Sequence, residues 1–178
     1  MKHTALSLRG MIYASLFGAG TAAGAYLVIP LPPVPITLQT LFLGLAGALL
    51  GARLGALSQL IYLLIGIIGL PVFAGGKAGL GVLFGPTGGY LIGFVVGAWV
   101  IGALVSLKKN AGFVWICAAL AVGTLVIYFF GVAQLSLVAK LSLNKAIAVG
   151  ALPFLIGDAV KILAAAFVVK KVKPRLTL

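Results

Sequence analysis

The sequence predicts an all-α membrane protein in which six transmembrane helices form one compact bundle. Two features of the composition predict it: 63% of the 178 residues are hydrophobic and only 8% are charged. Such a sequence cannot build a polar shell around a soluble core. A third feature is that the apolar residues form long runs separated by short segments. Because this length allows about six spans of roughly 20 residues, we expect residues 1–178 to form a single transmembrane domain.

The first three spans are expected at about 11–30, 37–51 and 55–70. Small residues recur every four positions in the first span, at Ala14, Gly18 and Ala22, a spacing that lets another helix approach closely. Two interpretations stay open: packing within the bundle, or docking of a separate membrane subunit. Prolines crowd the segment 30–35, which predicts a stiff, extended connector. A tight turn at 51–55 then joins two antiparallel helices.

The segment 69–90 is the longest irregular stretch, and it is rich in glycine but also apolar. Non-helical backbone at membrane depth is tolerated only where it is buried in protein or lines a cavity. We therefore expect it to fold over the mouth of the bundle. The last three spans are expected at about 88–106, 112–132 and 146–169. In the fifth span, Trp115 and Tyr128 are interpreted as aromatic anchors near the membrane interfaces.

The basic residues predict how the bundle is oriented. With six spans both termini lie on one side, which collects nine of the 13 lysines and arginines: Lys2, Arg9, Arg53, Lys108, Lys109, Lys170, Lys171, Lys173 and Arg175. The other side holds Lys77, Lys140 and Lys145. Since basic residues are enriched in cytoplasmic loops, both termini are expected in the cytoplasm. The net charge of +12 is attributed to this topology and to membrane lipid, not to nucleic acid.

Asp158 is the only acidic residue of the sequence, and it lies in the last apolar run. Lys161 follows three positions later and projects from the same helix face. An ionisable residue at membrane depth is costly, so it indicates function by default. A structural ion pair, a proton relay and polar anchoring of a ligand are the roles considered. Anchoring is favoured because a pair this costly stabilises poorly and because the lysine holds the carboxylate ionised.

The residue inventory argues against catalysis. One acidic residue, one cysteine and one histidine exclude paired carboxylates, a Ser-His-Asp triad and a multi-residue metal site. Cys117 lies in an apolar run and is expected to be a small core residue. No nucleotide-binding motif and no internal repeat is evident. We therefore expect a protein without metal or cofactor that binds a solute and needs a partner to drive its transport.

Four segments, taken together and in order, carry a family resemblance. They are PPVPITLQT at 32–40, GLPVFAGG at 69–76, GPTGGYL at 85–91 followed by Gly93-Phe94, and Gly157-Asp158 with Lys161. Together they closely resemble BioY, the biotin-binding S component of energy-coupling factor (ECF) transporters, over essentially the whole chain. The resemblance implies a six-helix S-component fold. It also implies an outward-facing pocket closed by the loops after the first and third spans.

The resemblance further implies roles for particular residues in this substrate-binding domain. Asp158 and Lys161 would be the polar anchors for biotin. The residues that would enclose its bicyclic ring or border the pocket are Tyr90, Phe73, the backbone of Gly75 and Gly76, Thr37 and Gln39. The two anchors would divide the ligand between them in a way that the resemblance leaves open.

The resemblance implies partners as well. The face of small residues at Ala14, Gly18 and Ala22 would dock on the transmembrane coupling protein, and two cytosolic ATPases would complete the transporter. The implied function is high-affinity biotin capture and uptake in the bacterial cytoplasmic membrane. The alternative is an autonomous biotin carrier, working by itself or by self-association, because some family members are encoded without a dedicated coupling module.

Overall fold

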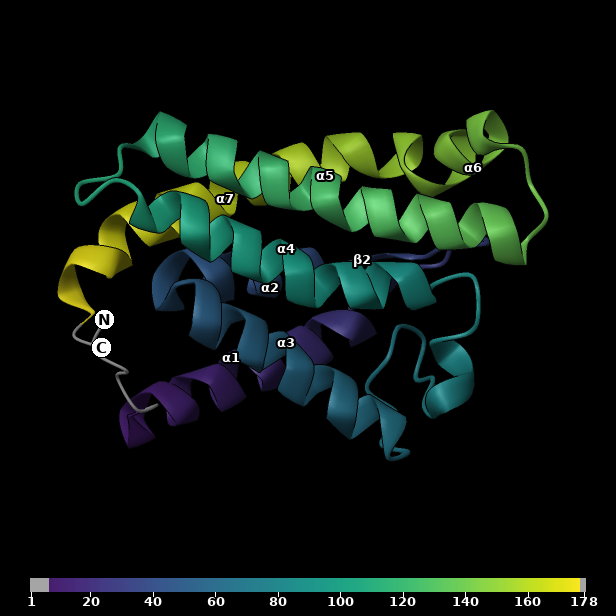
Figure 1. The fold of residues 1–178 in the computed structure, drawn as a ribbon, viewed down its shortest axis with the longest axis horizontal. Coiled ribbons are helices and arrows are strands. Elements are labelled where there is room, and N and C mark those ends of the chain that lie inside the picture. Colours follow the sequence, from purple (N-terminus) through teal and green to yellow (C-terminus); the bar gives the residue numbers. More distant parts are fainter. Residues whose placement is uncertain (1–6, 177–178) are drawn as a thin grey trace.

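The computed structural model describes residues 7–176, and most of them are helical (Figure 1). The elements in chain order are α1 (Leu8–Tyr26), β1 (Val28–Ile29), β2 (Ile36–Thr37), α2 (Gln39–Leu50), α3 (Ala52–Ile67), the 3-10 turn η1 (Leu80–Val82), α4 (Gly88–Ser106), α5 (Phe113–Val138), α6 (Leu143–Gly150), the 3-10 turn η2 (Leu152–Phe154), α7 (Leu155–Val172) and the 3-10 turn η3 (Lys173–Arg175).

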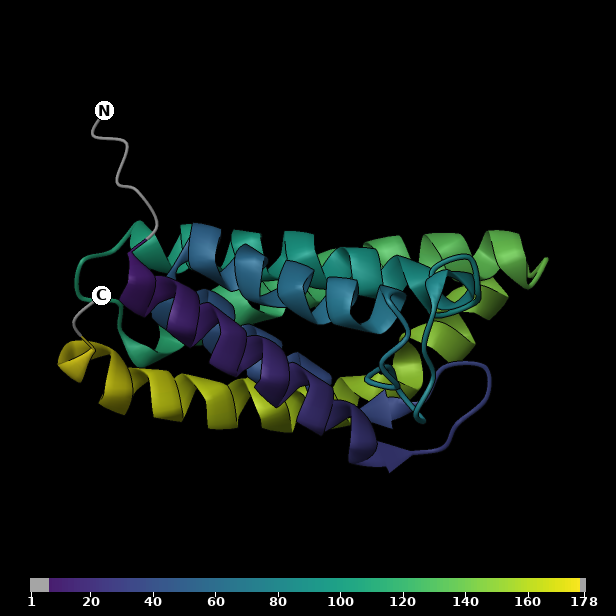
Figure 2. The same cartoon turned by 90° about the horizontal axis from the view of Figure 1, so that it is seen from below.

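The helices form a bundle around α2. In Figure 1, α4 and α5 run side by side, α3 lies next to α4, and α1 lies next to α3. Figure 2 shows α1 and α7 on one side and α3, α4 and α5 on the other. α2 contacts α1, α3, α4 and α7, and eight of its 12 residues are buried. At Gly47 a Cβ atom would lie 2.6 Å from the backbone oxygen of Ala98, so α2 can approach α4 this closely only with glycine there.

The proline-rich connector forms the loop of a short hairpin. α1 ends at Tyr26, and β1 pairs antiparallel with β2, with Val28 opposite Thr37 and Ile29 opposite Ile36. Residues 30–35 between the two strands are not helical, as predicted, and extended strands flank them at 28–29 and 36–37. The next connection is tighter than predicted: Gly51 alone separates α2 from α3, with a φ of +83° that glycine adopts readily.

The last predicted span is interrupted. Instead of one helix over 146–169, the chain forms α6, a 3-10 turn containing Pro153, and then α7. Proline lacks the N–H that a continuous helix needs. The break places Asp158 in the first turn of α7, not in the middle of a helix. There the positive end of the helix dipole favours a carboxylate.

The small residues of α1 lie mostly inside the bundle. Ala14 is fully buried, and a Cβ atom at Gly18 would lie 2.8 Å from the backbone oxygen of Ser58 on α3. Ala22 is half-buried and packs against the core. In this conformation α3 covers Ala14 and Gly18, so the packing interpretation holds for them and a separate subunit has no access to either. The reason is that α1 turns this face toward α3 rather than toward the membrane.

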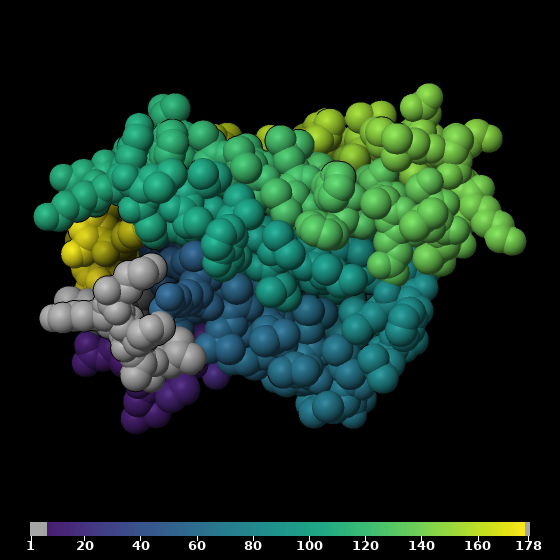
Figure 3. Space-filling view, in the orientation of Figure 1, coloured from purple at the N-terminus to yellow at the C-terminus, as the bar shows by residue number. Residues whose placement is uncertain are grey.

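The outer surface of the bundle is strongly apolar. Figure 3 shows one face, on which side chains of α3, α4 and α5 form a continuous surface. Large apolar side chains are exposed along the helices, among them Leu64, Trp99, Leu125, Phe129 and Phe167. Within residues 7–176, three stretches are long and apolar enough to cross a membrane: Gly88–Ser106, Phe113–Val138 and Leu143–Arg175. Such a surface suits contact with lipid and indicates a membrane protein.

The two ends of the bundle differ in charge. The start of α1, the turn before α3, the α4–α5 loop and the end of α7 lie together at one end (Figures 1 and 2). These segments carry eight of the basic residues assigned to one side, while Lys2 lies outside the described residues. At this end the Nζ atom of Lys108 lies 4.1 Å from the ring centroid of Trp115. The hairpin, the loop over 68–87 and α6 lie at the opposite end.

Candidate ligand-binding pocket

A pocket opens at the end of the bundle that carries the hairpin and the long loop. It holds about 710 Å³ of empty space, counting its open mouth. Five aromatic residues contribute to its walls: Phe73, Tyr90, Phe94, Tyr128 and Phe154. The polar residues that line it are Thr37, Gln39, Thr40, Lys77, Thr87, Asp158 and Lys161. A mostly apolar pocket with a few polar groups is typical of small-molecule binding sites.

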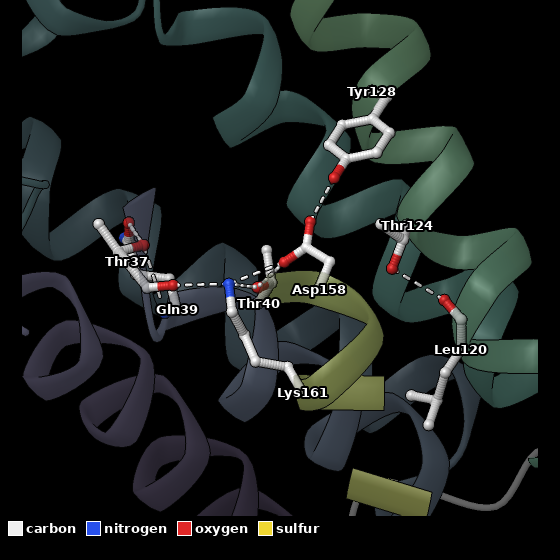
Figure 4. A network of polar contacts seen from close by, with 8 residues as sticks. All are labelled: Thr37, Gln39, Thr40, Leu120, Thr124, Tyr128, Asp158 and Lys161. Atoms are coloured by element: carbon white, nitrogen blue, oxygen red, sulfur yellow. Dashed lines mark hydrogen bonds and ion pairs between the residues drawn. The ribbon is translucent and has the colours of Figure 1, made fainter. Parts of the chain in front are cut away.

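Asp158 and Lys161 form an ion pair on α7. The Nζ atom of Lys161 lies 2.7 Å from Oδ1 of Asp158, and the side chains are 12% and 7% exposed. This confirms that the two project from one helix face. Lys161 also donates to the backbone oxygen of Thr37 at 2.8 Å and to Oγ1 of Thr40 at 3.0 Å (Figure 4). The three N–H groups of its ammonium therefore all have acceptors within the protein.

The carboxylate of Asp158 is held from three helices. Its Oδ1 accepts from Lys161 on α7 and from the Thr40 hydroxyl on α2 at 3.2 Å. Its Oδ2 accepts from the Tyr128 hydroxyl on α5 (Figure 4). A carboxylate oxygen accepts about two hydrogen bonds, so Oδ2 keeps one position for a further donor. Asp158 lines the pocket, so a donor on a ligand bound there can use this position.

The ion pair also separates two cavities. A second hollow lies on the other side, among residues of α2, α4, α5 and α7; its empty space is about 270 Å³ counted with its opening, but it has room for only about one water molecule. Thr40, Asp158 and Lys161 contribute to the walls of both. Thr124, which lines the second cavity, donates to the backbone oxygen of Leu120 at 3.0 Å. The polar network is therefore the floor of the larger pocket.

A chain of hydrogen bonds runs up the α2 side of the pocket. The Thr37 hydroxyl donates to the Gln39 side chain at 2.9 Å, and the Gln39 amide donates to the Tyr62 hydroxyl. Tyr62 donates to the backbone oxygen of Val72 at 3.2 Å. Tyr62 also meets Phe73 edge to face, with ring centroids 5.6 Å apart. This chain fixes the start of the long loop relative to α2 and α3.

Tyr90 forms the wall on the α4 side. Its hydroxyl donates to the backbone oxygen of Gly150 on α6 at 2.7 Å. The ring fits there because two neighbours have no side chain: a Cβ atom at Gly131 would lie 2.3 Å from the ring, and one at Gly150 would lie 2.4 Å from the hydroxyl. The tyrosine is thus locked by glycines that lie 41 and 60 residues further along the chain.

Six of the eight residues predicted for the ligand site line this pocket, namely Asp158, Lys161, Tyr90, Phe73, Thr37 and Gln39. Gly75 and Gly76 do not. They form the exposed turn of the long loop, each with a φ of +73°, while their neighbours Ala74 and Lys77 line the pocket. Their contact with a ligand stays a prediction, and what the structure gives them is a turn that other residues adopt rarely.

Tyr128 and Thr40 are the residues in contact with Asp158 that the sequence reasoning did not assign to the site. Tyr128 was interpreted as an interface anchor, but its hydroxyl contacts Asp158 inside the bundle. A signal was available, because Tyr128 lies ten residues before the end of α5 and a hydroxyl at that depth needs a partner. Thr40 had no such signal, since its contact with Asp158 bridges 118 positions of sequence.

Comparison with known proteins gives consistent matches. A sequence model of the BioY family matches residues 1–177. The biotin transporter BioY of Thermotoga maritima is 43% identical over 166 residues, which cover 93% of this chain and 96% of the relative. The biotin transporter BioY of Rhizobium etli is 40% identical over 171 residues, which cover 90% of this chain and 91% of the relative.

A solved structure agrees with these matches. The crystal structure of the S-component for biotin from an ECF-type ABC transporter has a TM-score of 0.87 and 28% identity to this chain. The alignment covers 94% of this chain and 92% of that one. The bundle thus has the fold of an ECF S-component, and family match, relatives and structure agree over nearly the whole sequence. On these grounds the chain belongs to the BioY family.

Proposed function

We propose that this protein captures biotin and is the substrate-binding subunit of an ECF-type transporter. The observation that carries the proposal is the pocket floor: one carboxylate, oriented by three helices and with one acceptor position free, below aromatic walls. Biotin has a ureido ring with two N–H donors, an apolar thioether ring and a carboxylate tail. A carboxylate acceptor, aromatic side chains and a cation match these groups. Binding of this kind uses neither a metal nor a cofactor.

In the proposed complex the ureido ring lies against Asp158, with one N–H donating to the free position on Oδ2. Tyr90 and Phe73 enclose the bicyclic ring, and Thr37 and Gln39 border it. Gly75 and Gly76 shape the loop above it. Lys161 pairs with Asp158 at 2.7 Å and orients its carboxylate, which supports ligand anchoring.

The proposed setting is the bacterial cytoplasmic membrane, crossed six times by α1, α2, α3, α4, α5 and α7. The basic end of the bundle would face the cytoplasm, with both termini there, and the pocket would open outward. The protein would not hydrolyse ATP itself: a transmembrane coupling protein and two cytosolic ATPases would drive transport. The small-residue motif of α1 at Ala14, Gly18 and Ala22 remains the predicted docking element, which requires α1 to move away from α3 so that the motif becomes accessible.

Titration of the purified protein with biotin tests the proposal, with Asp158→Asn as the key variant. We expect saturable binding, and at least about a 10-fold loss of affinity in the variant, since a hydrogen bond to a charged group contributes about 1.5–3 kcal/mol. Thr124→Val is the control, because it removes a hydroxyl that lies outside the pocket. No saturable binding by the unaltered protein would refute the proposal, and unchanged affinity in Asp158→Asn would remove Asp158 from the site.

The second candidate is an autonomous carrier. The hollow beyond the Asp158–Lys161 pair marks where a solute route through the bundle would continue, but it has room for only about one water molecule and would have to widen. The test is uptake of labelled biotin by liposomes that contain this protein alone. Uptake above that of protein-free liposomes would support the carrier. Binding of biotin without uptake would argue against the autonomous carrier and would be consistent with the role of an S component.

A further inference from the structure

Two lysines line the pocket, and their surroundings differ. Lys161 lies at the floor, with its three N–H groups donated to Thr37, Thr40 and Asp158 (Figure 4). Lys77 lies on the long loop and is exposed. Within residues 7–176 the side chain of Lys77 makes no hydrogen bond or ion pair. Asp158 neutralises Lys161, so Lys77 is the cation that gives the pocket its net positive charge.

The loop holds Lys77 in place at the pocket. The backbone N–H of Phe73 donates to the backbone oxygen of Lys77 at 3.0 Å, and the two residues form an antiparallel bridge. Gly76 donates to the backbone oxygen of Phe73 at 3.0 Å, which closes the turn between them. Phe73 itself is 1% exposed and packs on Tyr62. A buried residue thus anchors the backbone that presents the lysine.

The floor is poorly suited to a second carboxylate. A ligand carboxylate could reach Lys161 only by displacing one of its three acceptors. It would also lie next to Asp158, and two like charges at close range in a shielded site repel strongly. The free position on Oδ2 of Asp158 calls for a donor, which a carboxylate is not. The ammonium of Lys77 meets none of these obstacles.

We propose that Lys77 binds the carboxylate of the ligand. The ligand then lies with its ureido ring at the floor against Asp158 and its carboxylate at the mouth, and Lys161 makes no direct contact with the carboxylate. This inference rests on the proposed function, because it assigns the two ends of biotin within the same pocket. It makes Lys77 a residue that selects for the charged tail of the ligand.

The test compares biotin with biotin amide, whose tail carries no charge. Dissociation constants of both ligands are measured for the unaltered protein and for Lys77→Gln, Lys77→Arg, Lys161→Gln and Lys145→Gln. Lys145 is the matched control, since it is an exposed lysine at the same end of the bundle and does not line the pocket. We expect Lys77→Gln to weaken biotin by about 5- to 30-fold, which corresponds to the loss of about 1–2 kcal/mol, and biotin amide by less than about 2-fold.

The other variants separate the alternatives. Lys77→Arg and Lys145→Gln are expected to bind biotin like the unaltered protein. Lys161→Gln is expected to weaken both ligands by the same factor, because Lys161 acts through Asp158. Equal losses for both ligands in Lys77→Gln, or no loss, would overturn the inference. So would a loss specific to biotin in Lys161→Gln. If the unaltered protein binds neither ligand, it is the proposed function that fails.

Discussion

At the scale of single residues, Asp158 depends on groups far from it in sequence. Its partner Lys161 is three positions away, but Tyr128 is 30 and Thr40 is 118 positions away. Each supplies one hydrogen bond to a carboxylate that is mostly shielded from solvent. A shielded charge is tolerated when such bonds replace its hydration. The position of the Asp158 carboxylate therefore depends on hydrogen bonds from three helices, although Asp158 itself belongs to α7.

Tyr128→Phe should weaken this assembly without creating a cavity. Losing one hydrogen bond to the carboxylate should lower stability by about 1.5–3 kcal/mol, and biotin affinity should fall because Asp158 is less well oriented. Thermal unfolding in detergent and biotin titration measure the two effects. Tyr13→Phe is the control, since Tyr13 is half-buried and lies outside the pocket. Equal shifts of the unfolding temperature in both variants would contradict a specific role for Tyr128.

At the scale of elements, the break between α6 and α7 positions the site. An unbroken helix over 146–169 would carry Asp158 in mid-span with its backbone groups paired. The 3-10 turn with Pro153 instead starts a new helix at Leu155, and Phe154 at the break lines the pocket. A helix broken at membrane depth is tolerated where it faces protein or a cavity. The pocket provides that cavity.

The turn of the long loop offers an element-scale prediction. Gly76→Ala places a side chain on a backbone with a φ of +73°, and the left-handed conformation costs about 1–2 kcal/mol for a residue other than glycine. No atom lies near the new Cβ, so the effect comes from the backbone alone. We expect the turn to shift and biotin affinity to fall several-fold. Gly81→Ala is the control, because Gly81 lies in the same loop with as much space for a Cβ atom but has no positive φ, and it should bind biotin normally. A loss of biotin affinity in Gly81→Ala would show that any substitution in the loop weakens binding.

The two faces of α1 should respond differently to a larger side chain. Gly18→Leu forces α1 away from α3, because its Cβ would lie 2.8 Å from the backbone oxygen of Ser58. Overpacking of this kind costs about 1–3 kcal/mol and should lower the unfolding temperature. Ala19 is exposed, so Ala19→Leu should leave stability and biotin binding unchanged. If Ala19→Leu nevertheless weakens co-purification with a coupling protein, the exposed face of α1 is the docking face.

At the scale of the whole molecule, charge and pocket lie at opposite ends of the bundle. The basic segments gather where α1 begins and α7 ends, while the hairpin, the long loop and the pocket mouth lie at the other end (Figures 1 and 2). Basic residues are retained on the cytoplasmic side. In the proposed orientation, the pocket at the opposite end would receive a ligand from outside the cell.

Cysteine labelling checks this orientation. In a Cys117→Ala background, Lys145→Cys should react with a membrane-impermeant maleimide in intact cells, whereas Lys109→Cys should react only after permeabilisation. Both positions are exposed, one at the pocket end and one in the loop between α4 and α5. The reverse pattern would invert the proposed orientation. Labelling of both in intact cells would contradict a single membrane crossing by α5 between the two positions.

The sequence by itself determined the features that depend on local composition. Long apolar runs predict helices in a membrane, clustered prolines predict the connector before α2, and the span over 88–106 coincides with α4. A lone acid in an apolar run predicts a site at Asp158, since its cost does not depend on the fold. The family resemblance extended this site to eight residues, six of which line one pocket. Signals of this kind lie in short segments or in family motifs, so they can be recognised in a single sequence.

Only the tertiary structure decided which distant groups meet. It brought Tyr128 and Thr40 to Asp158, directed Ala14 and Gly18 toward α3, and left Lys77 unpaired at the pocket. These outcomes depend on the rotation of each helix and on the distance between helices. Glycines at the contact points allow the close approach, but the composition of the sequence does not determine which helices meet there. The two kinds of feature differ in the sequence separation of the residues that interact. A helix or a turn forms between neighbouring residues, whereas the hydrogen bond between Thr40 and Asp158, 118 positions apart, forms only when the helices have packed together.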